Sequence, residues 1–305
     1  VCNAWFVSRR DAGPRMPNIG EIWRPGVLLA LILVVAQTGP AAAEKSAETA
    51  QSDWAAAAEQ PAATAQSDTA RGLAIAREAD RRDQGFGDTK ADLTMALQLS
   101  PTDRVIRTMR QMVLEVEGDG DKSIMVFDRP RDLKGTAILT FSHREGNDDQ
   151  WLYLPALKRV KRISSADQSG PFMGSEFAFE DLASQEVEKY RYRYLRDETL
   201  DGEPTYVVER IPVDPNSGYS RQVTWIDKSE YRLRRVDYYD RKGDLLKTMT
   251  LGGYRQYLDR YWRPETMAMT NHQSGKSTLL RFDNYRFRTG LSDSDFSRGA
   301  LSRIR

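Results

Sequence analysis

The chain has very little cysteine, little histidine and no long apolar run. Its one cysteine is Cys2, and it has two histidines among 305 residues. One cysteine cannot form an intramolecular disulfide, and two distant histidines supply no closely spaced ligands for a metal. The clearest apolar run, residues 26–36, is too short for a membrane-spanning helix, which needs about 20 residues. The sequence therefore disfavours disulfide-stapled, metal-dependent and helix-spanned membrane proteins.

The first 68 residues have the composition of an export signal followed by a linker. The apolar run GVLLALILVVA precedes small residues that suit cleavage after Ala43, and Met16 would begin a signal of ordinary length. No cysteine for lipid attachment follows that run. Residues 44–68 are rich in Ala, Gln, Ser and Thr, as flexible linkers are. We predict a signal peptide over 1–43, a linker over 44–68, one domain over 69–305, and a periplasmic protein without a lipid anchor.

Positive and negative charges are almost balanced. The chain has 45 Lys and Arg against 44 Asp and Glu, and removing the four basic and two acidic residues of the signal leaves 41 against 42. Charges of both signs are interspersed along the rest of the chain. This balance gives no argument for nucleic-acid binding, which usually requires a basic surface.

One helix and then many strands are predicted after the linker. Residues 69–83 place apolar side chains on one face and charges opposite, and Gly85 ends the segment. Apolar and polar residues alternate over 93–99, and similar short segments follow, separated by turn residues such as those at 118–121 and 201–202. Ten or more consecutive strands with short connections predict an antiparallel meander.

A sheet with so many strands accumulates twist and curls, so it must close or cover its edges. Few helical segments can cover it: residues 69–83, 130–133, 176–184 and 292–301. We therefore expect a curled sheet with helices on its concave face and an apolar interior. A closed barrel or a sandwich would show the same period of two.

Several sequence blocks occur in an order that resembles a known family. They are GFGD (85–88), FDRPRDLKGTAILTFSH (127–143), WLYLPALKRVKRISSADQSGPFMGSEFAFEDL (151–182), SGYSRQVTWID (217–227), YYDRKGDLLKT (238–248) and FRTGLSDSDF (287–296). Over about residues 72–305 the chain resembles the LolA-like outer-membrane lipoprotein-sorting proteins, a periplasmic family often found beside RND-type exporters. The resemblance implies a mainly β fold, an unclosed antiparallel β-barrel with a few covering α-helices. It also implies carriage of a lipid or an acylated protein.

No residue pattern indicates catalysis. His143 and His272 each end a predicted strand, and no G-x-S-x-G turn accompanies them. Glu176 and Glu180 are the best candidates for an acid–base pair, because they would share one face of a short helix. Acids after Ser175 are, however, typical of a capped helix start. We predict that the protein is not an enzyme and has no catalytic residue, metal site or cofactor.

Candidate binding residues follow from the apolar phase of the strands and from one aromatic loop. We predict a lipid-binding cavity wall formed by Leu93, Met95, Leu97, Met112, Leu114, Leu139, Phe141, Trp225, Met249 and Met267. We predict a lid or rim formed by Phe172, Met173, Phe177 and Phe179, although an ordinary core explains these rings equally well. Basic clusters at 158–162 and 232–235 indicate solvated faces, a site for a phosphate headgroup, or a surface for an acidic partner.

The sequence predicts a periplasmic carrier that binds acyl chains of lipoproteins or lipids in an apolar cavity and delivers them toward the outer membrane. Its partners would be those acyl chains, an RND-type inner-membrane exporter and an outer-membrane acceptor, with no nucleic acid. The alternative is a non-enzymatic adaptor of an RND-type exporter. The alternation alone does not tell which strand face lines the cavity.

Overall fold

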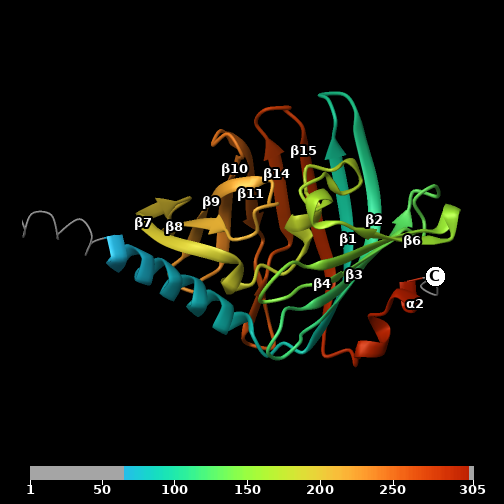
Figure 1. The fold of residues 1–305 in the computed structure, drawn as a ribbon, viewed down its shortest axis with the longest axis horizontal. Helices are drawn as coiled ribbons and strands as arrows, with labels where there is room; N and C mark the ends of the chain where they lie inside the picture. Colours follow the sequence, from blue (N-terminus) through green and yellow to red (C-terminus); the bar gives the residue numbers. More distant parts are fainter. Residues whose placement is uncertain (1–64, 302–305) are drawn as a thin grey trace, which may run out of the picture. The chain divides into compact units, whose positions relative to one another are not determined.

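A curved antiparallel sheet of 13 strands dominates the computed structural model, which describes residues 65–301 (Figure 1). In chain order its strands are β1 (Asp88–Gln98), β2 (Arg104–Leu114), β3 (Lys122–Arg129), β4 (Ala137–Phe141), β5 (Asp149–Leu154), β6 (Arg159–Ile163), β7 (Tyr190–Leu200), β8 (Glu203–Pro212), β9 (Tyr219–Asp227), β10 (Leu233–Asp240), β11 (Leu245–Gly252), β14 (Thr266–Asn271) and β15 (Ser277–Phe287). The strands β12 (Arg255–Tyr257) and β13 (Tyr261–Arg263) form a separate hairpin.

The strand order shows that the sheet does not close. It runs β6-β5-β4-β3-β2-β1-β15-β14-β11-β10-β9-β8-β7, so β6 and β7 lie at opposite edges and β1 pairs with β15 in the middle. Every pairing is antiparallel, and each half of the sheet is close to a meander, as expected from short connections. The prediction of a mainly β, unclosed antiparallel barrel with ten or more strands and few helices is confirmed.

The two faces of the sheet bury different sets of side chains. On the inner face, Leu93, Met95 and Leu97 of β1 belong to a large cluster that also includes residues of β10, β11, β14 and β15. On the outer face, a smaller cluster packs β3 and β4 against Phe296 and Leu301 near the end of the chain. The alternation along each strand produces this division, because successive side chains point to opposite faces. We call these the inner and outer clusters.

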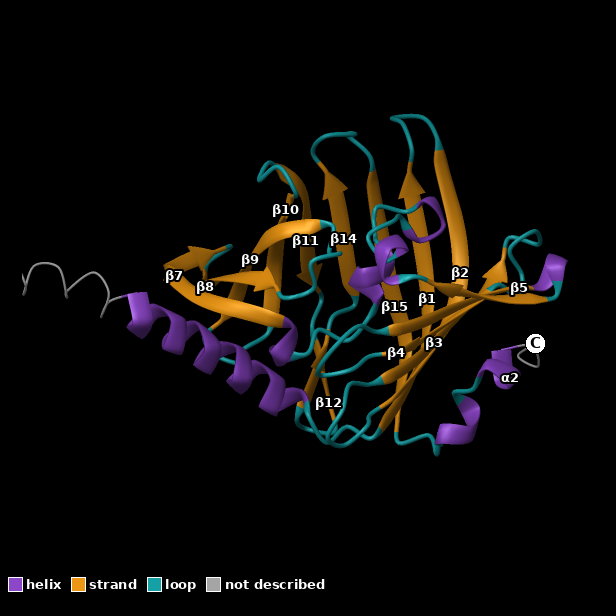
Figure 2. Ribbon diagram, viewed as in Figure 1, coloured by secondary structure: helices purple, strands orange, loops and turns teal. Residues whose placement is uncertain are grey.

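One long helix covers part of the inner face beside β7 and β8 (Figure 2). It extends over residues 65–83, so it includes the last four residues of the predicted linker, which begin with the helix-favouring Ala65. Its Ile75 is buried against Val208 and Ile226 of the sheet. Gly72 lies so close to β7 that an added Cβ would be 2.7 Å from the Tyr194 backbone nitrogen.

Several predicted helices are shorter in the structure than expected. Residues 130–133 form part of a turn, so that helix prediction is wrong; the turn connects β3 to β4 directly. The segment 176–184 contains only the 3₁₀ turn η4 (Phe179–Leu182), and 292–301 contains η6 (Asp293–Asp295) and α2 (Arg298–Leu301). Other 3₁₀ turns are η1 (Pro155–Leu157), η2 (Ser165–Asp167), η3 (Phe172–Gly174) and η5 (Val187–Lys189).

Predictions for the amino terminus fall largely outside the described residues. The signal peptide over 1–43 and the linker up to residue 64 belong to this part of the chain. The predicted domain boundaries stay predictions. Within residues 65–301, no helix combines the length and the apolar character that crossing a bilayer requires.

Candidate functional site

The connection between the two edge strands determines where the site forms. Because β6 and β7 lie at opposite edges, residues 164–189 must cross the open side of the sheet. Their short helical turns lie in front of the central strands in Figure 2, and their side chains reach β9, β11 and β14. The Glu176 amide donates a hydrogen bond to the Thr278 hydroxyl of β15. We call residues 164–189 the crossing segment.

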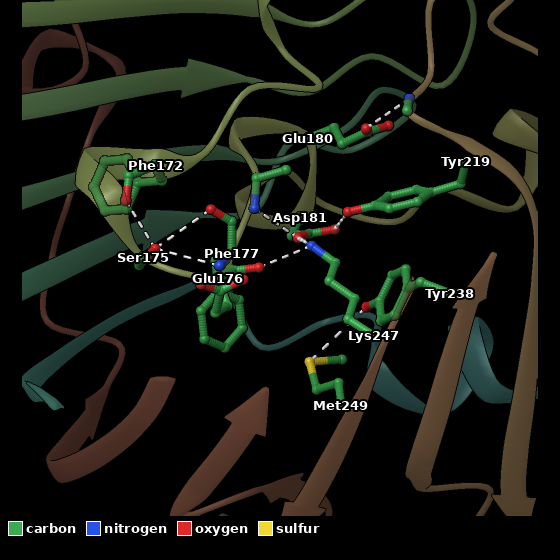
Figure 3. Close-up of polar contacts among 12 residues, drawn as sticks. Phe172, Ser175, Glu176, Phe177, Glu180, Asp181, Tyr219, Tyr238, Lys247 and Met249 are labelled. Carbon is green, nitrogen blue, oxygen red and sulfur yellow. Dashed lines mark hydrogen bonds and ion pairs between the residues drawn. The ribbon is translucent and has the colours of Figure 1, made fainter. Parts of the chain in front are cut away.

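A buried ion pair fixes the crossing segment to the inner face (Figure 3). The Lys247 ammonium, on β11, lies 2.7 Å from the Asp181 carboxylate and also donates a hydrogen bond to the Glu176 carbonyl at 2.9 Å. The other Asp181 oxygen accepts a hydrogen bond from the Tyr219 hydroxyl at 2.9 Å. Lys247 also lies near the Tyr219 and Tyr238 rings, with its nitrogen 5.1 and 5.2 Å from their centroids.

Glu176 and Glu180, the candidate acid–base pair, have separate structural partners. The Glu180 carboxylate accepts hydrogen bonds from the Ser217 hydroxyl at 2.8 Å and the Gly218 amide at 2.9 Å. Burial raises the pKa of Glu180 above its ordinary value, and the Asp181 charge adds to this. Glu176 instead accepts a hydrogen bond from the Asn271 side chain at 2.7 Å. Both carboxylates therefore hold the crossing segment in place.

The four predicted lid residues lie on this crossing segment. Phe172 is completely buried, and its ring packs 5.8 Å from Phe127 of β3 and 5.5 Å from Phe179. Phe177 is also buried, whereas Met173 is partly buried and its carbonyl accepts a hydrogen bond from Arg107 at 2.6 Å. Among the four, Phe177 borders the large cavity described next. Their action as a moving lid stays a prediction.

A cavity of about 930 Å³ lies beside the crossing segment. Its walls are the inner faces of β1 to β3, β7 to β11, β14 and β15, together with the long helix, part of the crossing segment between residues 177 and 187, and the β12–β13 hairpin. Apolar side chains form its bed, among them Val208, Met249, Leu251, Met267, Leu280 and Phe282. The volume lies near the upper end of the range of roughly 300–1,000 Å³ that small-molecule sites occupy.

The ten predicted wall residues separate into four groups. Met249 and Met267 line the cavity. Leu93, Met95 and Leu97 belong to the same inner cluster, but they do not border the cavity. Met112, Leu114, Leu139 and Phe141 point to the outer face and pack in the outer cluster. Trp225 packs with Val207 and Val223 in a further outer-face cluster.

Of the ten predicted residues, these last eight do not border the cavity. They were predicted on the assumption that the apolar positions of every strand face the same side of the sheet. In β2 and β4 apolar character does not identify the inner face, because apolar residues occur on both faces of these strands.

The two basic clusters of the sequence have different surroundings. The cluster at 158–162 lies on the edge strand β6 and its preceding turn, where these cations are exposed and do not border the cavity. In the cluster at 232–235, Arg232 borders the cavity, but its guanidinium pairs with the Asp227 carboxylate at 2.7 Å. Arg235 pairs with Asp237 at 2.9 Å. Neither cluster offers the cavity an unpaired guanidinium.

The two histidines lie apart, in the connections that follow β4 and β14. The His143 Nδ1 is 2.9 Å from an Asp119 carboxylate oxygen, and the His272 Nε2 is 2.8 Å from the Thr248 hydroxyl. The contact with His143 lowers the pKa of Asp119 to about 2. Within residues 65–301, no group of three or more His, Cys, Asp or Glu residues is placed to hold a metal ion.

Comparison with solved structures shows what this chain is similar to. A domain from Vibrio parahaemolyticus that is named for outer-membrane lipoprotein sorting is 57% identical, with a TM-score of 0.76. The match covers 77% of this chain and 100% of that one. The chain belongs to the same family as this outer-membrane lipoprotein-sorting domain. A DUF1329 family protein from Desulfovibrio piger is 31% identical over 77% of this chain and 99% of that one, with a TM-score of 0.73.

Three further comparisons are more distant or more general, and one of them shares the LolA-like fold. A LolA superfamily protein from Nitrosomonas europaea, 23% identical over 75% of this chain and 98% of that one, shares the fold with a TM-score of 0.61. A family model described as "-like: Uncharacterized protein" matches residues 119–303. A comparison with curated proteins gave no match. The family resemblance predicted from the sequence blocks is confirmed.

Two important cations of this LolA-like protein were not found from its sequence. Lys247 and Arg210 are buried on the inner face, in phase with the cavity residues Met249 and Val208 of the same strands. The signal was present, because a cation two residues from an apolar inner position must point to the same face. It was not used, because charges on strands are more often solvated.

Proposed function

We propose that this protein is a periplasmic carrier that holds acyl chains of lipoproteins or lipids in the 930 Å³ cavity and delivers them toward the outer membrane. The observation that carries the proposal is the apolar bed on the inner face of an unclosed sheet. A relative that is 57% identical and named for outer-membrane lipoprotein sorting supports the same role.

Burial of methylene groups supplies the binding energy without any chemical step. Each CH₂ that leaves water contributes about 0.8 kcal/mol, so a long acyl chain would be held firmly. Met249 and Met267 suit this purpose, because the unbranched methionine side chain adapts to a flexible ligand. The carrier therefore needs no cofactor and no catalytic residue.

Loading and release require part of the cavity wall to move, and the long helix is the best candidate. Its ion pairs Arg71–Asp197 with β7 and Arg82–Glu230 with the β9–β10 turn are partly exposed and 3.5 Å long, and Asp83 also pairs with Arg263 of the β12–β13 hairpin. Exposed pairs contribute roughly 0–1 kcal/mol each. The crossing segment, by contrast, is held through the buried Lys247–Asp181 pair. We therefore expect the helix to open while the crossing segment stays in place.

Native mass spectrometry with lipid extraction tests the carrier. The chain from Glu44, purified from a periplasm without detergent, should carry a phospholipid or an acylated peptide. A protein that stays empty after incubation with lipids would contradict the proposal. Copurification with an exporter in the absence of lipid would favour an adaptor instead.

A pair of double variants shows whether the cavity holds the lipid. Met249→Lys with Met267→Lys places two charges in the apolar bed and should abolish lipid retention, because a charge is costly in an apolar cavity. Thr250→Lys with Thr270→Lys is the matched control, since these exposed residues lie on the outer faces of the same two strands. Equal lipid retention by both folded variants would rule out this cavity.

A further inference from the structure

A row of polar and aromatic side chains crosses the inner face at one register level. Paired positions on adjacent strands give the series Tyr192 (β7), Arg210 (β8), Gln222 (β9), Tyr238 (β10), Lys247 (β11) and Asn271 (β14). The crossing segment supplies carboxylates to two members, Asp181 to Lys247 and Glu176 to Asn271. The row therefore forms a polar border along the apolar bed.

Arg210 differs from Lys247, because its charge has no carboxylate partner in the described part of the chain. It is 8% exposed, and its Nε and Nη2 atoms donate hydrogen bonds to the Gln222 and Gln185 side-chain oxygens, at 2.7 and 3.3 Å. Its guanidinium carbon lies 4.5 Å from the centroid of the Tyr190 ring. These partners are neutral, whereas a buried charge usually requires an ionic partner.

Two carboxylates of the crossing segment, those of Asp181 and Glu180, have other partners. Asp181 is bonded to Lys247 and Tyr219, and Glu180 to Ser217 and the Gly218 amide. Their positions on the crossing segment are thus fixed by contacts that do not include Arg210.

The other arginines that border the cavity are also accounted for by the described residues. Four of them form ion pairs: Arg81 and Arg82 with Glu78, Arg232 with Asp227, and Arg263 with Asp83. Arg260 is exposed and donates to backbone carbonyls of residues 81 and 84. Arg210 thus remains as a buried guanidinium at the cavity wall with neutral partners alone.

We propose that Arg210 binds the anionic headgroup, a carboxylate or a phosphate, of an acyl lipid whose chain lies in the cavity. This inference rests on the carrier function proposed above and narrows its ligand to anionic lipids. A guanidinium presents a planar set of donors that matches both anions and can bind them through two hydrogen bonds.

The register of β8 places Arg210 beside the apolar side chains of the cavity. Val208, two residues before Arg210 on β8, points to the same face and borders the cavity, about 6.6 Å away along the strand. The next register level, two residues along each strand from the polar row, consists of the paired positions Val208, Thr224, Val236 and Met249. An acyl chain that leaves the anion therefore passes from the polar border directly onto apolar side chains.

Palmitate and methyl palmitate test the inference, because they share a chain and differ in the charge of the head. The mature chain, stripped of lipid, is titrated with each by native mass spectrometry. The wild type should bind palmitate about tenfold to hundredfold more tightly, the range expected for hydrogen bonds to a charged group. Arg210→Gln should lose this preference and still bind methyl palmitate. Arg193→Gln is the control, since that exposed arginine lies on the adjacent strand β7.

The wild-type comparison needs no variant, so it decides the inference even if Arg210→Gln fails to fold. Equal binding within this pair and also within the phospholipid pair described next would overturn the anionic headgroup and leave the carrier function intact. Binding of neither compound would overturn both. A preference in Arg210→Gln equal to that of the wild type would overturn the role of Arg210.

A second pair of ligands separates the two anion sources. Phosphatidylglycerol is compared with diacylglycerol, which has the same two chains and no phosphate. If phosphatidylglycerol binds more tightly than diacylglycerol while palmitate and methyl palmitate bind equally, the headgroup is a phosphate. If palmitate binds more tightly than methyl palmitate while the two glycerolipids bind equally, the headgroup is a carboxylate. Either result supports the anionic site, and equal binding of the charged and the uncharged compound in both pairs contradicts it.

Discussion

The Lys247 ammonium lies 2.7 Å from the Asp181 carboxylate, with 5% and 4% of the two side chains exposed. The pair joins β11 to a segment 66 residues earlier in the chain. A buried ion pair contributes little net stability but makes other arrangements costly, because each would leave a charge unpaired. We interpret this pair as the contact that selects one position for the crossing segment.

Removing one member of that pair should be far more harmful than removing both. Lys247→Met should lower the free energy of unfolding by about 3–5 kcal/mol, because the Asp181 charge would stay buried without its partner. The double variant Lys247→Met with Asp181→Asn should lose less than the sum of the single losses. Urea denaturation of the four proteins measures this coupling. Additive losses would show that the two charges act independently.

Truncation of Phe172 should loosen the crossing segment from the sheet. Its ring is fully buried between Phe127 and Phe179, so Phe172→Ala should cost about 3–5 kcal/mol and leave a cavity. Hydrogen exchange should rise at the amides of residues 170–180. The partly buried Met173 provides the control, because Met173→Ala removes less buried surface. A similar loss for both variants would count against Phe172 as the main apolar anchor.

The sequence predicted the sheet far better than the path of the chain across it. Alternation over 93–99 and turn residues such as those at 118–121 specify individual strands, because side-chain direction follows directly from the period of two. The pairing of β1 with β15 joins residues 179 to 198 positions apart, and no local pattern encodes it. The unclosed arrangement came from the family resemblance instead.

The cavity wall was harder to predict for a related reason. Both Met249 and Leu139 occupy apolar positions of strands, yet Met249 faces the cavity and Leu139 faces the carboxyl-terminal segment. The period distinguishes two faces within a strand but does not say which one is inner. Phe296 and Leu301 bury part of the outer face, so apolar character alone could not separate the two.

Gly72 should not tolerate even a methyl group. Alanine would gain about 1 kcal/mol in helix propensity, but its Cβ would lie 2.7 Å from the Tyr194 backbone nitrogen and 2.9 Å from the Arg193 carbonyl carbon. A backbone contact cannot move aside, so we expect Gly72→Ala to cost roughly 1–3 kcal/mol. Faster hydrogen exchange over residues 65–83 would show the helix lifting from β7. Increased thermal stability would mean that helix propensity outweighs the contact.

Asp121 should make the stability of the protein depend on pH near neutrality. It borders the cavity, and burial raises its pKa to about 7, with further contributions from the charges of Glu186, Glu115 and Asp83. The folded state therefore binds a proton more tightly than the unfolded chain, whose aspartate has the ordinary value of 3.8. This contribution to stability is complete below about pH 4 and is lost as the pH rises to about 7.

Asp121→Asn isolates that contribution, because asparagine cannot ionise. Relative to the wild type, the variant should gain roughly 1–3 kcal/mol between pH 4 and pH 7.5, less than a full shift allows since Asp121 is partly exposed and screened. Urea denaturation at both pH values measures the difference, with Glu203→Gln at an exposed position as the control. Parallel pH profiles for wild type and Asp121→Asn would show that Asp121 ionises without cost, and that water from the cavity reaches its carboxyl group.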